Sequence, residues 1–304
     1  MLIATWRPYR TTADLLEVGR LIRRGWATRP HWNAWTFARW DIWAQRRIAD
    51  ERLAGLTAWH DDLVLLPAPD GSLGGAAFLG DEPNEGVVIL DPEAPDGVDA
   101  ALDWLVDRYD GRTLDEALVV DAPARNRVLA AGLERRGFQR LEGHWVVREK
   151  SLAECSPIDV APGCEVRIHA IGPGDVGAYN RAVHAVFGRS RTNEAFEVLR
   201  EAPSYDPDLG VIAVNDDGRV LSFCHAWVDH ESGVAEIEPI GTVPGRQRLG
   251  LASAVIADLE GRLRDRGIPL VTVLAWGGAE PANRLYDRLD YRRVARQDSW
   301  ELAD

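Results

Sequence analysis

The sequence predicts an α/β protein made of two tandem domains with mixed α+β sheets, covering residues 1–152 and 163–304. Three observations support this prediction. Residues 165–304 alternate between strand and helix patterns. The segment 151–164 contains Pro157, Pro162 and Gly163 and breaks the patterns on both sides, as a linker does. Finally, a similar run of residues occurs late in both halves of a chain whose 304 residues suffice for two domains.

Local patterns predict each element of the second half. Glu165–Ile171 alternates as a strand, and two helical segments follow, the second beginning at the capping residue type Thr192. Asp216-Asp217-Gly218 is a hairpin signal between the next two strands. The expected helices are Asp175–Gly188, Thr192–Glu201, Gly250–Arg266 and Pro281–Leu289. The other expected strands are Leu209–Val214, Val220–Val228, Val234–Thr242, Leu270–Trp276 and a last one from Tyr291.

The composition excludes several classes of function. The chain is 46% apolar and 27% charged, as soluble globular proteins are. Its formal net charge of −13 argues against binding to nucleic acid or an anionic membrane, and would favour a cationic acceptor such as an amine. Cys155, Cys164 and Cys224 have neither a disulfide framework nor zinc-ligand spacing, so no metal is expected. Residues 1–7 lack the apolar core of a signal peptide, and no apolar run reaches membrane-spanning length. We therefore expect a cytoplasmic protein, with a homodimer left open.

The segment 243–252 is the most informative part of the chain. Gly245 and Gly250 let a backbone approach a ligand closely, between a predicted strand and a predicted helix. Arg246 and Arg248 lie where the new helix presents unpaired N–H groups and the positive end of its dipole. Together these features predict an anion site, most naturally for a pyrophosphate, although a plain strand–turn–helix junction is the alternative.

The pattern Gln-x-x-Gly-x-Ala at Gln247, Gly250 and Ala252 resembles the coenzyme A loop of the GNAT acyltransferases. The order of the elements in residues 165–304 is the order that this family would require. Neither a Walker loop nor a Rossmann fingerprint is present in the segment.

The resemblance extends to the last helix. Asn283-Arg-Leu-Tyr286-Asp-Arg-Leu-Asp-Tyr291 is similar to the family's Leu-Tyr-x-x-x-Gly-Phe, with Asp290-Tyr291 in place of Gly-Phe. Ala279 stands where an asparagine is often found. The resemblance implies acetyl-CoA as a co-substrate. The residues implied to bind it are Ile240, Gly241, Thr242, Val243, Gln247, Arg248, Leu249, Gly250, Leu251, Ala252 and Asn283.

The strand before the loop is unusual. Pro239 cannot donate a ladder hydrogen bond and Gly241 weakens a strand, so we expect a bulge or a splayed strand here. In the GNAT resemblance, this strand parts from its neighbour and its backbone pairs with pantetheine. The N–H groups from Ile240 to Val243 would then face the thioester carbonyl as an oxyanion hole.

Three side chains are candidates for the chemistry. Glu236 and Glu238 are two residues apart and project from one face of a strand, so either could act as general base, directly or through water. The alternative is a pair of solvated surface carboxylates. The resemblance makes Tyr286 the candidate general acid for the departing thiolate. Its alternative is a half-buried aromatic beside a core stripe of Leu285 and Leu289.

The first half resembles a degenerate copy of the second. Leu133-Glu-Arg-Arg-Gly137-Phe138 is similar to the ending that contains Tyr286. The equivalent of the anion loop is then Asp91–Val98, where Glu93 and Asp96 would repel a pyrophosphate and prolines remove N–H donors. This half is therefore expected to bind no coenzyme. The pairing resembles two-domain GNAT proteins of the mycothiol synthase type.

Histidines and tryptophans have mostly structural interpretations. No two of His184, His225 and His230 share metal-ligand spacing, and His225 is expected to be a satisfied structural histidine, although it could line an acceptor pocket. The dense first-half tryptophans are expected to pack in a core or an interface, with a pocket wall as the alternative. They are Trp26, Trp32, Trp35, Trp40 and Trp43.

The sequence thus predicts an acetyl-CoA-dependent N-acyltransferase that acts on a small amine by direct transfer, without a metal or a covalent enzyme intermediate. The first domain would serve as a scaffold. Transfer of a longer acyl group is one alternative, because the loop recognises coenzyme A and not the acyl chain. A non-catalytic acyl-CoA sensor or assembly module is the other.

Overall fold

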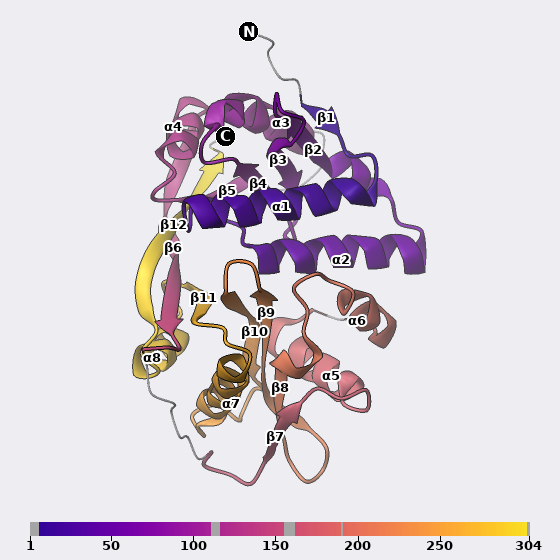
Figure 1. Cartoon of the computed structure of the whole chain (residues 1–304), viewed down its shortest axis with the longest axis vertical. Coiled ribbons are helices and arrows are strands. Elements are labelled where there is room, and N and C mark those ends of the chain that lie inside the picture. Colours follow the sequence, from indigo (N-terminus) through magenta and orange to yellow (C-terminus); the bar gives the residue numbers. More distant parts are fainter. Residues whose placement is uncertain (1–5, 111–115, 155–161, 190, 303–304) are drawn as a thin grey trace. The chain divides into compact units, whose positions relative to one another are not determined.

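The computed structural model describes residues 6–110, 116–154, 162–189 and 191–302. The chain divides into two compact units (Figure 1). Unit 1 comprises Met1–Val146, Trp276–Gly278 and Ala295–Asp304, and unit 2 comprises Val147–Ala275 and Ala279–Val294. Residues 155–161 of the predicted linker lie outside the described residues.

The first half of the chain forms a strand, two helices, three strands, and then a helix and a strand twice over. These elements are β1 (Arg7–Pro8), α1 (Thr12–Thr28), α2 (Phe37–Ala54), η1 (Ala58–Asp62), β2 (Leu63–Pro67), β3 (Leu73–Leu79), β4 (Glu85–Leu90), η2 (Pro95–Gly97), α3 (Val98–Asp110), β5 (Val119–Pro123), α4 (Arg127–Arg135) and β6 (Phe138–Ser151).

The second half repeats that order. Its elements are β7 (Arg167–Ala170), α5 (Val176–Phe187), α6 (Asn193–Leu199), η3 (Pro207–Leu209), β8 (Gly210–Val214), β9 (Val220–Asp229), β10 (Val234–Thr242), α7 (Leu251–Asp265), β11 (Leu270–Trp276), α8 (Glu280–Arg288) and β12 (Arg292–Leu302). The predicted elements are confirmed, and β10 and β11 have the predicted bounds. Thr192 caps α6 as expected, because its hydroxyl accepts the Ala195 N–H at 3.1 Å.

In each unit, the run of strands from one repeat is completed by the last strand of the other repeat. In unit 1 the strands follow the order β1-β2-β3-β4-β5-β12, and Gln297–Glu301 of β12 pairs antiparallel with β5. In unit 2 the order is β6-β11-β10-β9-β8-β7. The two compact units therefore divide within β6 and within β12.

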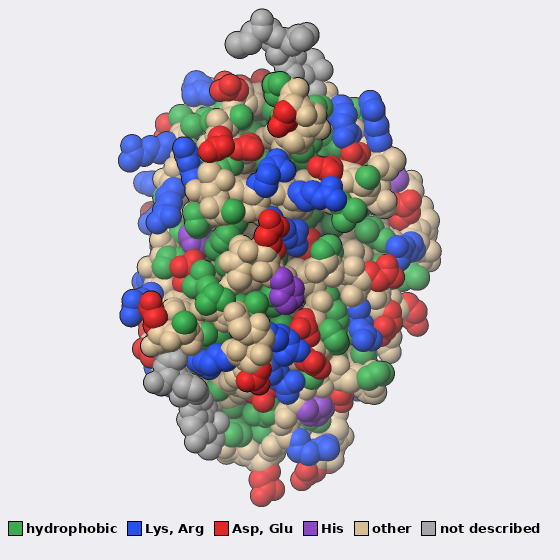
Figure 2. Space-filling view, in the orientation of Figure 1, with side chains coloured by type: hydrophobic (Ala, Val, Ile, Leu, Met, Phe, Trp, Pro, Cys, Tyr) green, Lys and Arg blue, Asp and Glu red, His purple; other side chains and the backbone are tan. Residues whose placement is uncertain are grey.

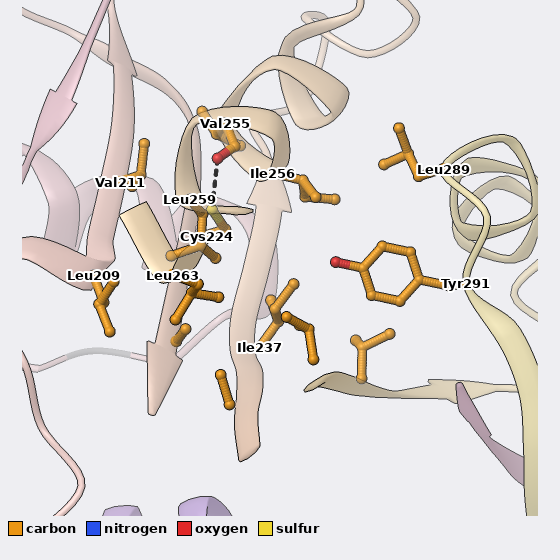
Figure 3. Packing of buried hydrophobic residues seen from close by; sticks show 14 of the residues in the cluster. Leu209, Val211, Cys224, Ile237, Val255, Ile256, Leu259, Leu263, Leu289 and Tyr291 are labelled. Atoms are coloured by element: carbon orange, nitrogen blue, oxygen red, sulfur yellow. Dashed lines mark hydrogen bonds between the residues drawn. The ribbon is translucent and has the colours of Figure 1, made fainter. Parts of the chain in front are cut away.

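The core of unit 2 lies between its sheet and α7 (Figure 3). Alternate residues of the strands, among them Val211, Cys224 and Ile237, face apolar residues of α7 such as Val255 and Leu259. The Cys224 thiol donates a hydrogen bond to the Val255 carbonyl at 3.3 Å. Burial raises the pKa of this thiol, so Cys224 packs as a small apolar residue.

The tryptophans of unit 1 form an aromatic core. Trp35, Trp40 and Trp43 are buried around Phe78, with ring centroids 4.9, 5.2 and 4.8 Å from that of Phe78. Tilted and edge-on arrangements of this kind are favourable between aromatic rings. The expected packing role of these three tryptophans is therefore confirmed.

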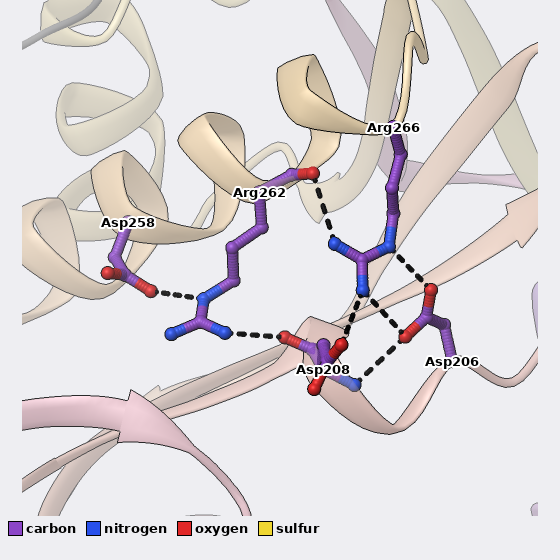
Figure 4. A network of polar contacts seen from close by, with 5 residues as sticks. All are labelled: Asp206, Asp208, Asp258, Arg262 and Arg266. Carbon is purple, nitrogen blue, oxygen red and sulfur yellow. Dashed lines mark hydrogen bonds and ion pairs between the residues drawn. The ribbon is translucent and has the colours of Figure 1, made fainter.

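A network of ion pairs ties the chain before β8 to α7 in unit 2 (Figure 4). Arg266 binds Asp206 through two nitrogens, at 2.6 and 3.1 Å, and reaches Asp208 at 2.8 Å. Arg262 donates to Asp258, four residues earlier, at 2.6 Å and to the Asp208 carbonyl at 3.3 Å. The fork geometry of Arg266 suits a carboxylate, so this contact fixes η3 against the end of α7.

Acidic and basic side chains are interspersed on the face that Figure 2 shows, without a large field of one sign. Among the described residues, no helix has the length and apolar character that crossing a membrane requires.

Candidate active site

The loop between β10 and α7 has the open geometry that an anion site needs. Gly245, Arg248 and Gly250 adopt φ angles of 79, 65 and 74°, the left-handed region that turns the chain sharply. Gln247 braces the turn, since its side-chain oxygen accepts the Gly245 N–H at 3.0 Å and its nitrogen donates to the Thr242 carbonyl at 3.5 Å. The loop is exposed to solvent from residue 244 to residue 248.

The first turn of α7 faces this loop. Gly250 is the N-cap residue, and it has no side chain to accept a hydrogen bond from the turn. The exposed side chains of Arg246 and Arg248 add positive charge to the positive end of the helix dipole. An anion with several oxygens matches this arrangement of donors and charge.

The strand before the loop is splayed, as predicted. β10 pairs with β11 from Val234 to Glu236, and the ladder between the two strands ends there. On the other side its register with β9 shifts between Ile237 and Ile240, which marks a bulge around Pro239. The backbones of β10 and β11 therefore part after Glu236, and this parting of the two strands is called the slot below.

Backbone alternation determines which N–H groups face the slot. The Val243 N–H donates to the Leu221 carbonyl at 2.9 Å, on the side away from the slot. Because successive residues of a strand direct their N–H groups to opposite sides, those of Ile240 and Thr242 face the slot. A Cβ atom at position 241 would come within 2.8 Å of the Phe223 side chain of β9, so glycine at this position lets β10 pack closely against Phe223.

The two candidate carboxylates have different surroundings. Glu236 is buried, with 5% of its surface exposed, whereas Glu238 is exposed at the bulge. The backbone carbonyl of Glu238 accepts a hydrogen bond from Trp227 Nε1 at 2.5 Å. Glu236 is therefore no solvated surface residue, and the interpretation as a surface pair fails for it.

Tyr286 of α8 is buried among the core residues of unit 2, with 3% of its surface exposed. Burial raises the pKa of its phenol, and the negative charge of Glu238 raises it further. Tyr286 and Glu238 are thus within electrostatic reach of each other. The phenol stays protonated at neutral pH, as a general acid must be before it donates.

Asn283, one turn before Tyr286, uses its side chain within unit 2. Its oxygen accepts from Arg148 at 2.9 Å and its nitrogen donates to the Ala279 carbonyl at 3.0 Å. Arg148 is not among the site residues predicted from the sequence. The available signal is the pair Arg148 and Lys150 two residues apart in a strand, which directs two cations to one face.

His225 is buried, with 1% of its surface exposed, and its ring stacks on Trp227 at 5.0 Å between centroids. Burial, helped by the positive charge of Arg191, lowers the pKa of His225 to about 3, so the imidazole is neutral. Its Nε2 has no hydrogen-bond partner among the described residues. The prediction of a structural histidine is therefore confirmed for its burial.

In unit 1 the corresponding strands, β4 and β5, also part, but a side chain of unit 1 forms hydrogen bonds with the backbone there. β4 pairs with β5 only at Glu85 and Gly86. Beyond that point, the Asn33 side chain donates to the Leu90 carbonyl at 3.1 Å and accepts the Leu90 N–H at 3.0 Å. A carboxamide thus takes both backbone groups that a ligand lying along the strand would use.

The equivalent loop of unit 1 carries acidic side chains where the loop of unit 2 carries arginines. The Asp91 carboxylate accepts the Glu93 N–H at 2.9 Å, so a backbone donor of this loop already has an anionic partner. η2 follows, with Pro95 and Asp96 in it. Neither the charge nor the donors favour a phosphate here.

Comparison with known proteins identifies the family. Residues 180–291 match the acetyltransferase (GNAT) family model. The chain is 30% identical over 228 residues to the mycothiol acetyltransferase of Thermomonospora curvata, and this match covers 69% of this chain and 76% of that protein. The chain belongs to the GNAT acetyltransferase family. This GNAT protein is also 30% identical over 240 residues to the mycothiol acetyltransferase of Clavibacter michiganensis, covering 77% of this chain and 78% of the relative. It is an N-acetyltransferase.

Solved structures share the whole fold. A GCN5-related N-acetyltransferase from Sphaerobacter thermophilus superimposes with a TM-score of 0.65 at 21% identity, covering 99% of this chain and 96% of that one. A tandem GNAT protein from the clavulanic acid biosynthesis pathway gives a TM-score of 0.66 at 14% identity, covering 99% of both chains. The predicted class, a mixed α/β fold of two tandem GNAT-like domains, is confirmed.

Proposed function

We propose that this GNAT protein transfers the acetyl group of acetyl-CoA to a small amine at the slot between β10 and β11. The observation that carries the proposal is the coincidence of two features in unit 2. The slot exposes the N–H groups of Ile240 and Thr242, and the open first turn of α7 follows directly after it. One ligand with an amide-containing arm and a pyrophosphate would use both.

The residues present suit coenzyme A. The pyrophosphate would accept hydrogen bonds from the N–H groups of Leu251 and Ala252, with charge from Arg246 and Arg248. The pantetheine arm would lie along β10, where its amides would meet the backbone of Ile240 and Thr242. The contributions of Val243, Gln247, Leu249 and Asn283 to coenzyme binding stay predictions, and Gln247 would act by bracing the loop.

The chemistry follows from these positions. The amine nitrogen attacks the thioester carbonyl carbon, a C–N bond forms and the C–S bond breaks. Glu238 or Glu236 takes the proton that the amine loses, and Tyr286 gives a proton to the departing thiolate. An N–H group facing the slot stabilises the oxyanion of the tetrahedral intermediate. Glu238 is the better placed of the two bases, because it is exposed to an incoming amine and lies within electrostatic reach of Tyr286.

We also propose a chemical class for the molecule that accepts the acetyl group. The name of the relatives makes an amine precursor of mycothiol the first candidate. The net charge of −13 favours an acceptor that arrives as a cation. We further propose that unit 1 binds no coenzyme and supports unit 2. A cytoplasmic location and a homodimer stay predictions.

The test is the release of free thiol from acetyl-CoA in the presence of a panel of amines. The panel contains mycothiol precursors, aminoglycosides, polyamines, amino acids and peptide N-termini. We expect turnover with at least one small amine and a marked preference within the panel. Stoichiometric binding of acetyl-CoA without turnover on any amine would instead support a sensor. Faster turnover with a longer acyl-CoA would change the donor and leave the site intact.

A further inference from the structure

Two cations of β6 are completely buried in unit 2. Arg148 and Lys150 have no exposed side-chain surface, and because they are two residues apart they project from the same face of the strand. A buried cation is retained only where good hydrogen bonds and counter-charges replace its water. The partners of these two residues therefore show what each one holds.

Arg148 holds α8. Its Nη2 and Nε donate to the Asn283 side-chain oxygen at 2.9 and 3.3 Å, and its Nη1 donates to the Asp287 carboxylate at 2.6 Å. Nη1 also donates to the Tyr291 backbone carbonyl at 3.0 Å, just beyond the end of the helix. One guanidinium thus forms hydrogen bonds with two successive turns of α8 and with the backbone just after the helix.

Along the helix, Tyr286 lies between Asn283 and Asp287, the two residues of α8 whose side chains accept hydrogen bonds from Arg148. The guanidinium carbon of Arg148 is 5.9 Å from the centre of the Tyr286 ring, within the range of a cation–π contact. A planar fork with five donors fixes both the position of α8 and its rotation about its axis, which a point charge would not do. The direction of the Tyr286 hydroxyl depends on that rotation.

We propose that Arg148 is a positioning residue for acetyl transfer, which clamps α8 so that the Tyr286 hydroxyl points at the departing sulfur. This inference rests on the proposed function of Tyr286 as general acid. The charge of Arg148 has a second effect in the same direction. It lowers the pKa of the Tyr286 phenol against the rise caused by burial and by Glu238, which makes the phenol a stronger acid.

Lys150 provides a matched control. It is equally buried on the same strand, but its ammonium binds Glu260 of α7 at 2.6 Å, and Glu260 also accepts from the Tyr291 hydroxyl at 2.9 Å. Arg264 lies 3.6 Å from the same carboxylate, so Glu260 keeps a cation when Lys150 is removed. Loss of Lys150 therefore tests loss of a buried cation without release of α8.

The experiment is a double-mutant cycle in the full chain. Arg148→Met and Tyr286→Phe are made singly and together, and kcat, KM and acetyl-CoA affinity are measured on folded protein. We expect each single variant to lower kcat, Tyr286→Phe by about 10²-fold and Arg148→Met by about 10-fold or more, with acetyl-CoA affinity changed less than about threefold. In the Tyr286→Phe background, Arg148→Met should cost less than about twofold, because no hydroxyl is left to aim. Arg148→Lys should restore only part of the rate.

Two further variants keep the test decisive. Lys150→Met should leave kcat of the folded protein within about twofold of wild type. Asp287→Asn weakens the clamp at a side chain that is 53% exposed, so it should fold even where Arg148→Met does not. It should lower kcat by about threefold or more in the wild-type background and leave the Tyr286→Phe variant unchanged.

The outcomes that contradict the clamp differ from those that contradict the proposed function. If Arg148→Met or Asp287→Asn lowers kcat by the same factor with and without the Tyr286 hydroxyl, the role is structural and the inference is wrong. An equal loss in Lys150→Met has the same meaning. If Tyr286→Phe alone turns over normally, the general acid of the proposed function is wrong, and the clamp falls with it.

Discussion

The Tyr286 ring of α8 is almost fully buried beside Tyr291, at 5.7 Å between ring centroids. The family's last-helix motif predicts the place of Tyr286 on α8, but not this burial. The sequence could not show this, because the packing involves Arg148 from a strand of the other repeat. Similarly, Glu236 and Glu238 are equivalent in the sequence, but Glu236 lies at the end of the β10–β11 ladder and is buried, whereas Glu238 lies at the bulge beside Pro239 and is exposed.

The first prediction concerns the hydroxyl of Tyr286. Tyr286→Phe removes that group and keeps the ring that packs in the core. Turnover should fall by about 10²-fold when chemistry limits the rate, and acetyl-CoA affinity should be nearly unchanged because the loop is untouched. Thiol release and calorimetry check the two quantities separately. Normal turnover with a good acceptor would return Tyr286 to a purely structural role.

The second prediction concerns the base. Glu238→Gln should remove most of the activity and leave acetyl-CoA binding intact, whereas Glu236→Gln should retain most of the activity of wild type. In the wild-type protein, kcat/KM should rise with pH until the essential amine or carboxylate has lost its proton, and then level off. Rate profiles from about pH 6 to 9 test both expectations. If the two glutamine variants turn over normally across that range, the base lies elsewhere.

At the scale of elements, local patterns predict most of unit 2. Pro239 and Gly241 predict the splayed strand because each has a physical effect on a ladder that needs no distant partner. The neighbours of β6 and β12 are a different matter. An alternating pattern determines which face of a strand is buried, but not which strand lies beside it, and both repeats end in strands of similar character. The exchange of last strands could therefore not be predicted.

The third prediction concerns the contact of η3 with α7. Burial opposes ionisation of Asp206, but hydrogen bonds from Arg266 and from the Asp208 N–H, with the Arg266 charge, outweigh it and lower the pKa of Asp206. A lowered folded-state pKa means that the ionised carboxylate stabilises the fold. This contribution is present above the unfolded-state pKa of about 4 and is lost as the pH falls through the folded-state value.

Asp206→Asn should therefore lower the free energy of unfolding by about 1 kcal/mol at pH 7, and the difference from wild type should shrink on acidification. Urea unfolding at neutral pH and at the lowest pH that the fold survives measures this. Asp258→Asn, which removes a more exposed pair within α7, should cost only about 0.3–0.5 kcal/mol and serves as the control. A cost for Asp206→Asn that does not change with pH would contradict the assignment.

At the scale of the whole molecule, two repeats share one order of elements and differ in the residues around the corresponding strand and loop. In unit 2, the loop has arginines, left-handed turns and an open helix end. In unit 1, the loop is acidic, and Asn33 occupies the backbone groups of Leu90. The acidic loop is evident in the sequence. The Asn33 contact is not, because it joins residues 57 positions apart without a local pattern.

Calorimetric titration of the full chain with acetyl-CoA tests the central claim, that one repeat alone carries the coenzyme site. The account predicts one site per chain and no binding to Gly250→Asp, which puts a side chain and a negative charge against the pyrophosphate. Gly267→Asp is the matched control, since Gly267 has a similar φ of 70° at the other end of α7 and open space around it. That variant should bind as wild type does. Two sites per chain, or binding that survives Gly250→Asp, would contradict the account.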